Sequence, residues 1–261
     1  MTHSARSTAA EAGDHPVVEK GARLGYAANG VLHLVLGWLA LQLALGSSSG
    51  EADQSGALAQ LGSTAIGAVL LWFIVAGFVL LALWQLTEAA VRGGAGDRVK
   101  ALAKAVVYGV LAATAFRSVQ GSGSGSSGDE QTSSMTATLM EQPFGRVLVG
   151  LVGLGIIAVG VYHVVKGWKK KFLEDLQRHP GTWGERAGRA GYAAKGIALA
   201  VVGGLFGWAA VTHDPEEAQG LDGALQTILE APFGQVLLVL VALGLAAYGV
   251  YSFFRARYGK V

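Results

Sequence analysis

The chain has 261 residues, of which 52% are hydrophobic and 15% charged, and its formal net charge is +2. A soluble domain carries about 25% charged residues, so this composition excludes an ordinary water-soluble globule and favours a membrane protein. The absence of Cys excludes disulfides and thiolate-bound metals, and the small net charge gives no reason to expect nucleic acid as a partner.

Six apolar stretches are candidates for membrane spans. A membrane-crossing helix needs about 20 mostly apolar residues, and the stretches that approach or exceed this length are 24–45, 65–90, 101–116, 145–165, 192–211 and 234–254. The third is the weakest, because it is short and contains Lys104. Short apolar runs can also be core helices of a soluble protein, but six of them alternating with polar loops favour a membrane bundle.

The charged residues predict the orientation of the spans. Lys and Arg are concentrated before the first span, after the second, after the fourth and at the end of the chain, whereas the intervening loops carry mainly Asp and Glu. Positive charge resists translocation across a membrane. We therefore expect a multi-pass protein of the plasma membrane, with the bilayer as a partner and both termini in the cytoplasm.

The segments outside the spans differ in character. Residues 1–20 have no apolar stretch, so we expect a flexible cytoplasmic tail and not a cleaved signal peptide. The Gly/Ser tract 121–128 is expected to be a flexible outer loop. At the start of the basic cytoplasmic link 169–188, Trp168, Phe172 and Leu176 recur every four residues. This spacing indicates an amphipathic segment at the inner membrane interface or a continuation of the fourth span. Residues 258–261 form a short C-terminal tail.

Sequence repeats divide the six spans into three pairs. The motif Arg-x-Gly-Tyr-Ala-Ala begins at Arg23 and at Arg189, and a degenerate copy begins at Arg98. The second span of each pair contains a Gly followed seven residues later by an aromatic residue, at Gly77 and Trp84, Gly155 and Tyr162, and Gly244 and Tyr251. Repeats with two spans each enter the membrane from the same side. The sequence therefore predicts three parallel helical hairpins at 21–92, 93–168 and 189–257, set around a pseudo-threefold axis or in an irregular bundle.

These motifs also resemble a known family. The repeated Arg-x-Gly-Tyr-Ala-Ala-(Asn/Lys)-Gly, followed by Gly-Ala-Leu and Pro-Phe-Gly-(Arg/Gln)-Val-Leu, is similar to the actinobacterial membrane proteins grouped as domain of unknown function 1206. The resemblance spans roughly residues 20–257 and implies an all-α polytopic bundle of six transmembrane helices in three two-helix units. The family supplies no settled activity and no catalytic residue. The middle copy departs most from the pattern, because it lacks the Gly-Tyr pair.

Glycines are the expected contact points between the helices. Lipid tails are as apolar as Leu, so membrane helices associate where small residues let their backbones approach. The fourth span is rich in Gly, and Gly203-x-x-x-Gly207 lies in the fifth. We expect these residues to pack helices within the chain; a homo-oligomer or a membrane-protein partner is the alternative.

Polar residues within the spans are the candidate functional positions. Asn29, Lys104 and Lys195 occupy the same repeat position. Either the two lysines extend to the cytoplasmic headgroups, or all three residues line a cytoplasmic-side vestibule on the repeat axis. His33 lies about 15 Å along its helix from Arg23 and makes a structural hydrogen bond or relays protons.

No convincing catalytic motif is present, and the sequence predicts no enzyme, cofactor or metal site. Gly46–Gly50 formally fits the Gly-x-Ser-x-Gly elbow of hydrolases, but it follows a membrane helix and not a strand. Two functional classes are open. The first is a structural or accessory membrane component that acts through helix packing, and the alternative is a small channel or transporter.

Overall fold

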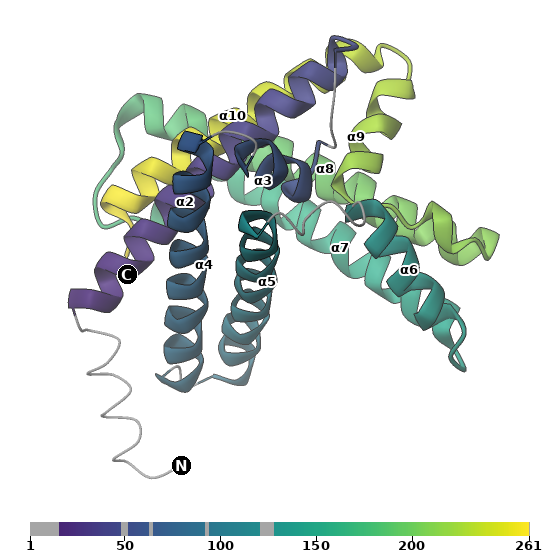
Figure 1. Ribbon diagram of the computed structural model, residues 1–261, viewed down its shortest axis with the longest axis horizontal. Helices are drawn as coiled ribbons and strands as arrows, with labels where there is room; N and C mark the ends of the chain where they lie inside the picture. The colour runs from purple at the N-terminus through teal and green to yellow at the C-terminus, as the bar shows by residue number, and fades with distance from the viewer. Residues whose placement is uncertain (1–15, 48–51, 63–64, 92–93, 121–127, 261) are drawn as a thin grey trace.

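The computed structural model describes residues 16–47, 52–62, 65–91, 94–120 and 128–260, and this part of the chain is helical without a named strand (Figure 1). Six helices are long and apolar enough to cross a membrane: α2 (Pro16–Ala44), α4 (Ala65–Val91), α5 (Ala95–Val119), α7 (Gly145–Trp168), α8 (Gly181–Thr212) and α10 (Gly234–Tyr258). The six predicted spans are confirmed, and the chain is an all-α multi-pass membrane protein.

Several spans extend beyond their predicted ends, and α8 (Gly181–Thr212) begins eleven residues before the predicted position 192. The third, α5, extends beyond both ends of the predicted segment 101–116, with Asp97 in its first turn and Arg117 in its last. These charges match the helix macrodipole, which favours acidic residues at the N-terminus and basic ones at the C-terminus. The first span, α2, begins at Pro16, so residues 16–20 of the predicted tail are helical. Pro suits the first helical turn, where its missing N–H is not needed. Residues 1–15 and 121–127 of the predicted flexible segments lie outside the described residues.

Each predicted hairpin also contains a short helix that the sequence reading missed. These helices are α3 (Gln54–Gly62), α6 (Gly128–Met140) and α9 (Leu221–Glu230), and each lies between two long helices of one repeat. The Gly-Ala-Leu motif at 56–58 and 223–225 lies inside α3 and α9, where its Ala and Leu side chains are fully buried. The motif therefore anchors a short helix on the bundle.

The two ends of the bundle differ in charge. The end with α3, α6 and α9 carries Asp53, Asp129 and Asp222, and we call it the acidic end. The opposite end is where α5 and α8 begin and where α7 and α10 terminate. It carries Arg98, Lys166, Arg189, Arg255 and Arg257, and we call it the basic end.

The six long helices form three close pairs, each from two different repeats. The second helix of repeat 1 packs on the first helix of repeat 2 (α4 with α5), the second of repeat 2 on the first of repeat 3 (α7 with α8), and the second of repeat 3 on the first of repeat 1 (α10 with α2). Figure 1 shows each pair as two helices running side by side. Each repeat therefore pairs with both others, while the contacts between the long helices run in an open row, α5–α4–α2–α10–α8–α7.

Two of these pairs share the same glycine contacts. In the α7–α8 pair, a Cβ on Gly160 would lie 2.7 Å from the carbonyl oxygen of Gly196. At the equivalent place in the α10–α2 pair, a Cβ on Gly249 would lie 2.8 Å from the carbonyl oxygen of Gly30. Real Cβ atoms do not approach this closely, so only Gly permits these backbone contacts. In these two interfaces Gly packs helices within the chain, as predicted.

Repeat 2 differs from the other two repeats in the contact between its own two long helices. In repeat 1 a Cβ on Gly77 would lie 3.0 Å from Ala28 Cβ, and in repeat 3 the equivalent Gly244 approaches Ala194. In repeat 2 a Cβ placed on Gly155 would contact no other helix within 4 Å in the described part of the chain. Lys100 stands where the other repeats have Gly25 and Gly191, so α5 lacks the small residue that admits the second helix. In Figure 1, α4 and α5 extend together away from α7 and α8.

The link after α7 also differs from the prediction. The helix ends at Trp168, Lys170 adopts a left-handed conformation, and the 3-10 helix η1 (Lys171–Asp175) follows. Phe172 and Leu176 are buried inside the protein, whereas Trp168 is exposed. The main chain beyond η1 bonds to the end of α10, because Gln177 N donates to Tyr258 O at 2.7 Å. The expectation of an amphipathic interfacial segment or a longer fourth helix is therefore wrong for Phe172 and Leu176, which pack inside the protein beside Tyr192 of α8 and Tyr251 of α10.

Candidate functional site

A polar junction lies where α2, α8 and α10 meet. His33 of α2 is buried, and its Nδ1 lies 2.9 Å from the carbonyl oxygen of Asn29. A carbonyl only accepts hydrogen bonds, so Nδ1 carries the proton and Nε2 presents a lone pair. Lys195 Nζ of α8 lies 3.5 Å from that Nε2 and 4.5 Å from the ring centroid of Tyr248 on α10. The ammonium group therefore contacts both an acceptor and an aromatic face.

Asn29 completes the junction. Its Nδ2 donates to Ser252 Oγ of α10 at 3.1 Å, and the Ser252 hydroxyl donates to the carbonyl oxygen of Tyr248 at 2.9 Å. Each of these side chains thus joins its helix to another helix or back to its own main chain. Polar groups inside a membrane are costly unless they are paired in this way, so the junction stabilises the contact between repeats 1 and 3.

The structure brings three of the four predicted polar positions together and leaves the fourth apart. Asn29, His33 and Lys195 share the junction, whereas Lys104 lies exposed on α5. Sequence reasoning placed Asn29, Lys104 and Lys195 at one repeat position but could not show that α5 extends away from α7. It also gave no reason to pair His33 with Lys195, because they come from different repeats.

An aromatic cluster lies beside the junction, toward the basic end. Tyr192 stacks on Phe172 with ring centroids 5.5 Å apart, and the Tyr251 hydroxyl donates to the carbonyl oxygen of Phe172 at 3.0 Å. Tyr248 and Tyr251 each lie close to Tyr192. The sequence reading missed this cluster. The signal that could have found it is Tyr192 and Tyr251 at the repeat positions where repeat 1 has Tyr26 and Trp84.

Charged side chains surround this cluster at the basic end. Asp175 of η1 accepts from Lys166 Nζ at 2.6 Å and lies 3.8 Å from an Arg255 nitrogen. The Arg255 guanidinium lies over the ring of Tyr26, 4.4 Å from its centroid. One carboxylate therefore holds the ends of α7 and α10 to the link, and Arg255 extends the contact to α2.

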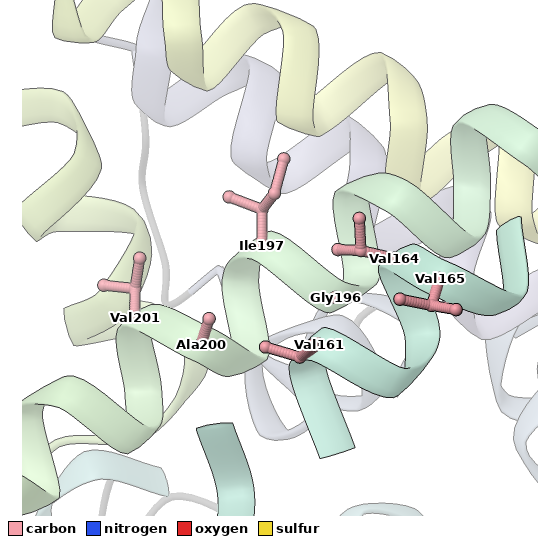
Figure 2. Close-up of a pocket in the computed structure, with 7 residues that line it drawn as sticks. All are labelled: Val161, Val164, Val165, Gly196, Ile197, Ala200 and Val201. Carbon is pink, nitrogen blue, oxygen red and sulfur yellow. The ribbon is translucent and has the colours of Figure 1, made fainter. Parts of the chain in front are cut away.

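Two apolar grooves lie between paired helices, each of about 400 Å³. Figure 2 shows the first, which is lined by Val161, Val164 and Val165 of α7 and by Gly196, Ile197, Ala200 and Val201 of α8. The second is lined by Val75, Val79 and Leu83 of α4 and by Gly109, Ala112 and Phe116 of α5, among others. Neither groove is lined by Asn29, His33, Lys104 or Lys195. Their apolar walls suit acyl chains better than ions.

The acidic end is joined by carboxylates that cap neighbouring helices. Asp129 of α6 accepts from the main-chain N–H groups of Gly220 and Gly223 at the start of α9, both at 2.7 Å. Asp222 of α9 accepts from Ala52 N, just before α3, at 2.6 Å. Burial raises the pKa of the Asp129 carboxyl, against the lowering effect of the two N–H donors. Among the described residues, no group of three or more His, Asp or Glu side chains could hold a metal ion.

Comparison with known proteins identifies the family of the chain. The family model described as Domain of Unknown Function (DUF1206) matches three tandem segments, residues 24–92, 99–170 and 190–259. The chain belongs to this family. The resemblance drawn from the repeated motifs is therefore confirmed.

A relative supports the same assignment over nearly the whole length. The protein named "Uncharacterized protein YxxB" of Bacillus subtilis (strain 168) is 33% identical over 256 residues, which cover 93% of this chain and 92% of the relative. No solved structure matches the chain at a significant level. The chain is thus an integral membrane protein of the DUF1206 family.

Proposed function

We propose that this protein is a structural or accessory component of the membrane that acts through helix packing. The observation that carries this proposal is the pair of equivalent glycine interfaces, α7 with α8 and α10 with α2, in which backbones touch without side chains between them. The polar junction adds to it, because its groups bond to one another across three helices. We further propose the repeat boundaries 21–92, 93–168 and 189–257 as the units of this assembly.

Reconstitution tests this function. Purified protein in liposomes should raise neither ion conductance nor solute uptake above that of empty vesicles. In native membranes, crosslinking should capture either a second copy or a membrane-protein partner. Measurable flux that depends on the intact junction would instead identify a transport protein.

We propose a plasma-membrane location with both termini in the cytoplasm. The support is the contrast between a basic and an acidic end under the rule that Lys and Arg stay on the cytoplasmic side. The chain has no Cys, so single-Cys variants give clean labelling. In intact cells a membrane-impermeant maleimide should label Glu216→Cys, at the acidic end, and should label Lys169→Cys only after lysis. The reverse pattern would overturn the orientation.

The second candidate function is a small channel or transporter with a cytoplasmic-side vestibule near Asn29 and Lys195; Lys104, at the equivalent position of repeat 2, is exposed on α5. The observation that favours it is the 3.5 Å approach of Lys195 Nζ to His33 Nε2 within the spans, since ionisable groups there often mark ion or proton paths. Unchanged conductance and uptake in a Lys104→Ala, Lys195→Ala double variant would remove this candidate.

A further inference from the structure

The apolar groove between α7 and α8 (Figure 2) has an equivalent place on the α10–α2 pair, where larger side chains lie. Val164 of α7 lines the groove, and the same repeat position on α10 is Phe253. Ala200 of α8 also lines it, and its equivalent on α2 is Leu34. The Phe253 ring covers Gly30, since a Cβ placed on Gly30 would lie 2.9 Å from it. At α7–α8, two smaller side chains leave this space open.

Both walls of the groove lead to a basic side chain at the basic end of the bundle. On α7, Lys169 N donates to Val165 O at 2.8 Å, so Lys169 lies one turn beyond the wall on the same face. On α8, Arg189 lies seven residues before Gly196, which is almost two full turns. The helices also touch here, because a Cβ on Gly167 would lie 3.1 Å from Arg189 O. The groove and the two basic residues therefore belong to one continuous surface.

The repeat arginine is bonded at one of these interfaces and exposed at the other. On α2, Arg23 Nη1 donates to the carbonyl oxygen of Arg257 at the end of α10, at 2.8 Å. Its equivalent Arg189 is exposed, and so is Lys169. Within the described part of the chain, neither Arg189 nor Lys169 makes a side-chain hydrogen bond or an ion pair. Both side chains are therefore available to an anion.

The charge around these two side chains is strongly basic. Residues 166–189 contain seven Lys and Arg against three Asp and Glu. Two of the three acids are already bonded to lysines, Glu185 to Lys170 at 2.6 Å and Asp175 to Lys166 at 2.6 Å. The surplus of positive charge at the mouth of the groove therefore favours an anionic occupant.

The walls of the groove favour an acyl chain over a transmembrane helix. The lining residues Val161, Val165 and Ile197 are β-branched and partly exposed. Membrane helices associate where small residues let their backbones approach, and these three side chains prevent that approach. A second copy in the same orientation would also bring its own basic residues to the same depth. A phospholipid supplies both a thin apolar chain and the opposite charge.

We propose that the α7–α8 groove binds one anionic phospholipid, with its phosphate between Lys169 and Arg189 and one acyl chain along the valines of α7. Val161 and Lys169 are about 12 Å apart along the helix, which is within one leaflet of a hydrocarbon core of about 30 Å. Because α7 is the last helix of the row of long helices, a lipid reaches the groove from the bilayer. The site does not depend on whether the protein has an accessory or a transport role.

Native mass spectrometry of detergent-purified protein tests the headgroup contact, with dioleoylphosphatidylglycerol and dioleoylphosphatidylcholine as probes. The protein should retain one phosphatidylglycerol with at least tenfold preference, because each basic residue near an anionic headgroup contributes about fivefold. Lys169→Gln, Arg189→Gln should abolish this preference. The matched control Lys171→Gln, Arg178→Gln also removes two exposed basic residues, from the link beyond α7, and should keep it.

A second variant tests the acyl path by copying the α10–α2 interface. Val164→Phe, Ala200→Leu introduces the two larger residues of that interface and should lower phosphatidylglycerol retention at least fivefold, with the melting temperature of the delipidated protein maintained. The control Val159→Phe places the same ring at an exposed position outside the groove and should leave retention unchanged.

Three results would overturn the proposal. The first is equal retention of the two lipids by the unaltered protein, and the second is loss of the preference in the link control. The third is a delipidated dimer in which an Ile197→Cys variant crosslinks between copies, because a second copy would then occupy the groove. If the filled-groove variant does not fold, the Lys169→Gln, Arg189→Gln variant and its control still decide the outcome.

Discussion

Repeat 3 and repeat 2 are built from the same motif but are stabilised in different ways. In repeat 3, α8 and α10 touch through Gly191 and Gly244, and their shared face carries Tyr192, Tyr248 and Tyr251 in the core. In repeat 2, α5 and α7 lie apart, and the equivalent face is exposed. The loss of the Gly-Tyr pair, whose positions are Lys100 and Ala101 in repeat 2, accompanies this change. In repeat 2, therefore, the two long helices are held by packing on helices of the neighbouring repeats and not by contact with each other.

The largest expected difference in the free energy of unfolding is between substitutions at Gly160 and at Gly155, five residues apart on α7. In Gly160→Leu the new side chain meets the backbone of Gly196 and Ala200, and such overpacking should lower the free energy of unfolding by about 3 kcal/mol. Gly155→Leu enters open space and should change it by less than about 0.5 kcal/mol. Thermal melts of the delipidated protein in detergent, followed by circular dichroism, measure both. Equal losses in the two variants would contradict the comparison.

The next effect concerns the polar junction. His33→Leu removes the acceptor of Lys195 and leaves a partly buried ammonium group without it, so the free energy of unfolding should fall by about 2 kcal/mol. Combining His33→Leu with Lys195→Met should reveal a coupling of about 1 kcal/mol in a double-mutant cycle.

The control cycle for the junction uses the lysine of repeat 2. His33→Leu combined with Lys104→Met should show no coupling, because Lys104 is exposed on α5, away from the junction. A coupling of similar size in both cycles would mean that Lys104 acts at the junction as well. That result would favour the shared vestibule over separate roles for the two lysines.

A smaller effect compares equivalent tyrosines. Tyr251→Phe removes the hydroxyl that donates to Phe172 O and should lower the free energy of unfolding by about 1 kcal/mol. Tyr162→Phe changes the exposed equivalent in repeat 2 and should leave the melting temperature unchanged. If the Tyr162 variant proved the less stable of the two, the aromatic cluster would not be what distinguishes repeat 3.

The smallest effect is a pH dependence at the acidic end. Burial raises the pKa of Asp129, so the folded protein favours the uncharged carboxyl. Its contribution to stability is therefore present below the ordinary carboxyl pKa of about 4 and is lost as the pH rises through the raised pKa. Between pH 3.5 and pH 6.5, the melting temperature of the Asp129→Asn variant should rise relative to that of the wild type as the pH increases. A difference that is independent of pH, or that shifts the other way, would count against this.

Much of the fold follows from local patterns. Apolar length predicted all six spans, and the repeated motif predicted the family, because both depend only on neighbouring residues in the chain. The short helices were missed, since ten-residue amphipathic segments such as α9 give a weak signal between two strong ones. At the candidate site the sequence predicted the polar positions Asn29, His33 and Lys195. It did not predict their partners Ser252 and Tyr248, because the register between helices is a property of packing.

The sequence by itself determined that the protein resides in a lipid bilayer, how many spans it has and that they form three parallel repeats. Composition and periodicity are local, and a bilayer sets a minimum apolar length of about 20 residues for every span. Only the tertiary structure decided that each repeat pairs with both others, that His33 meets Lys195, and that α5 and α7 do not pack on each other. These outcomes depend on which backbones can approach within a few ångströms, and that depends on small residues at particular positions more than on the apolar pattern around them.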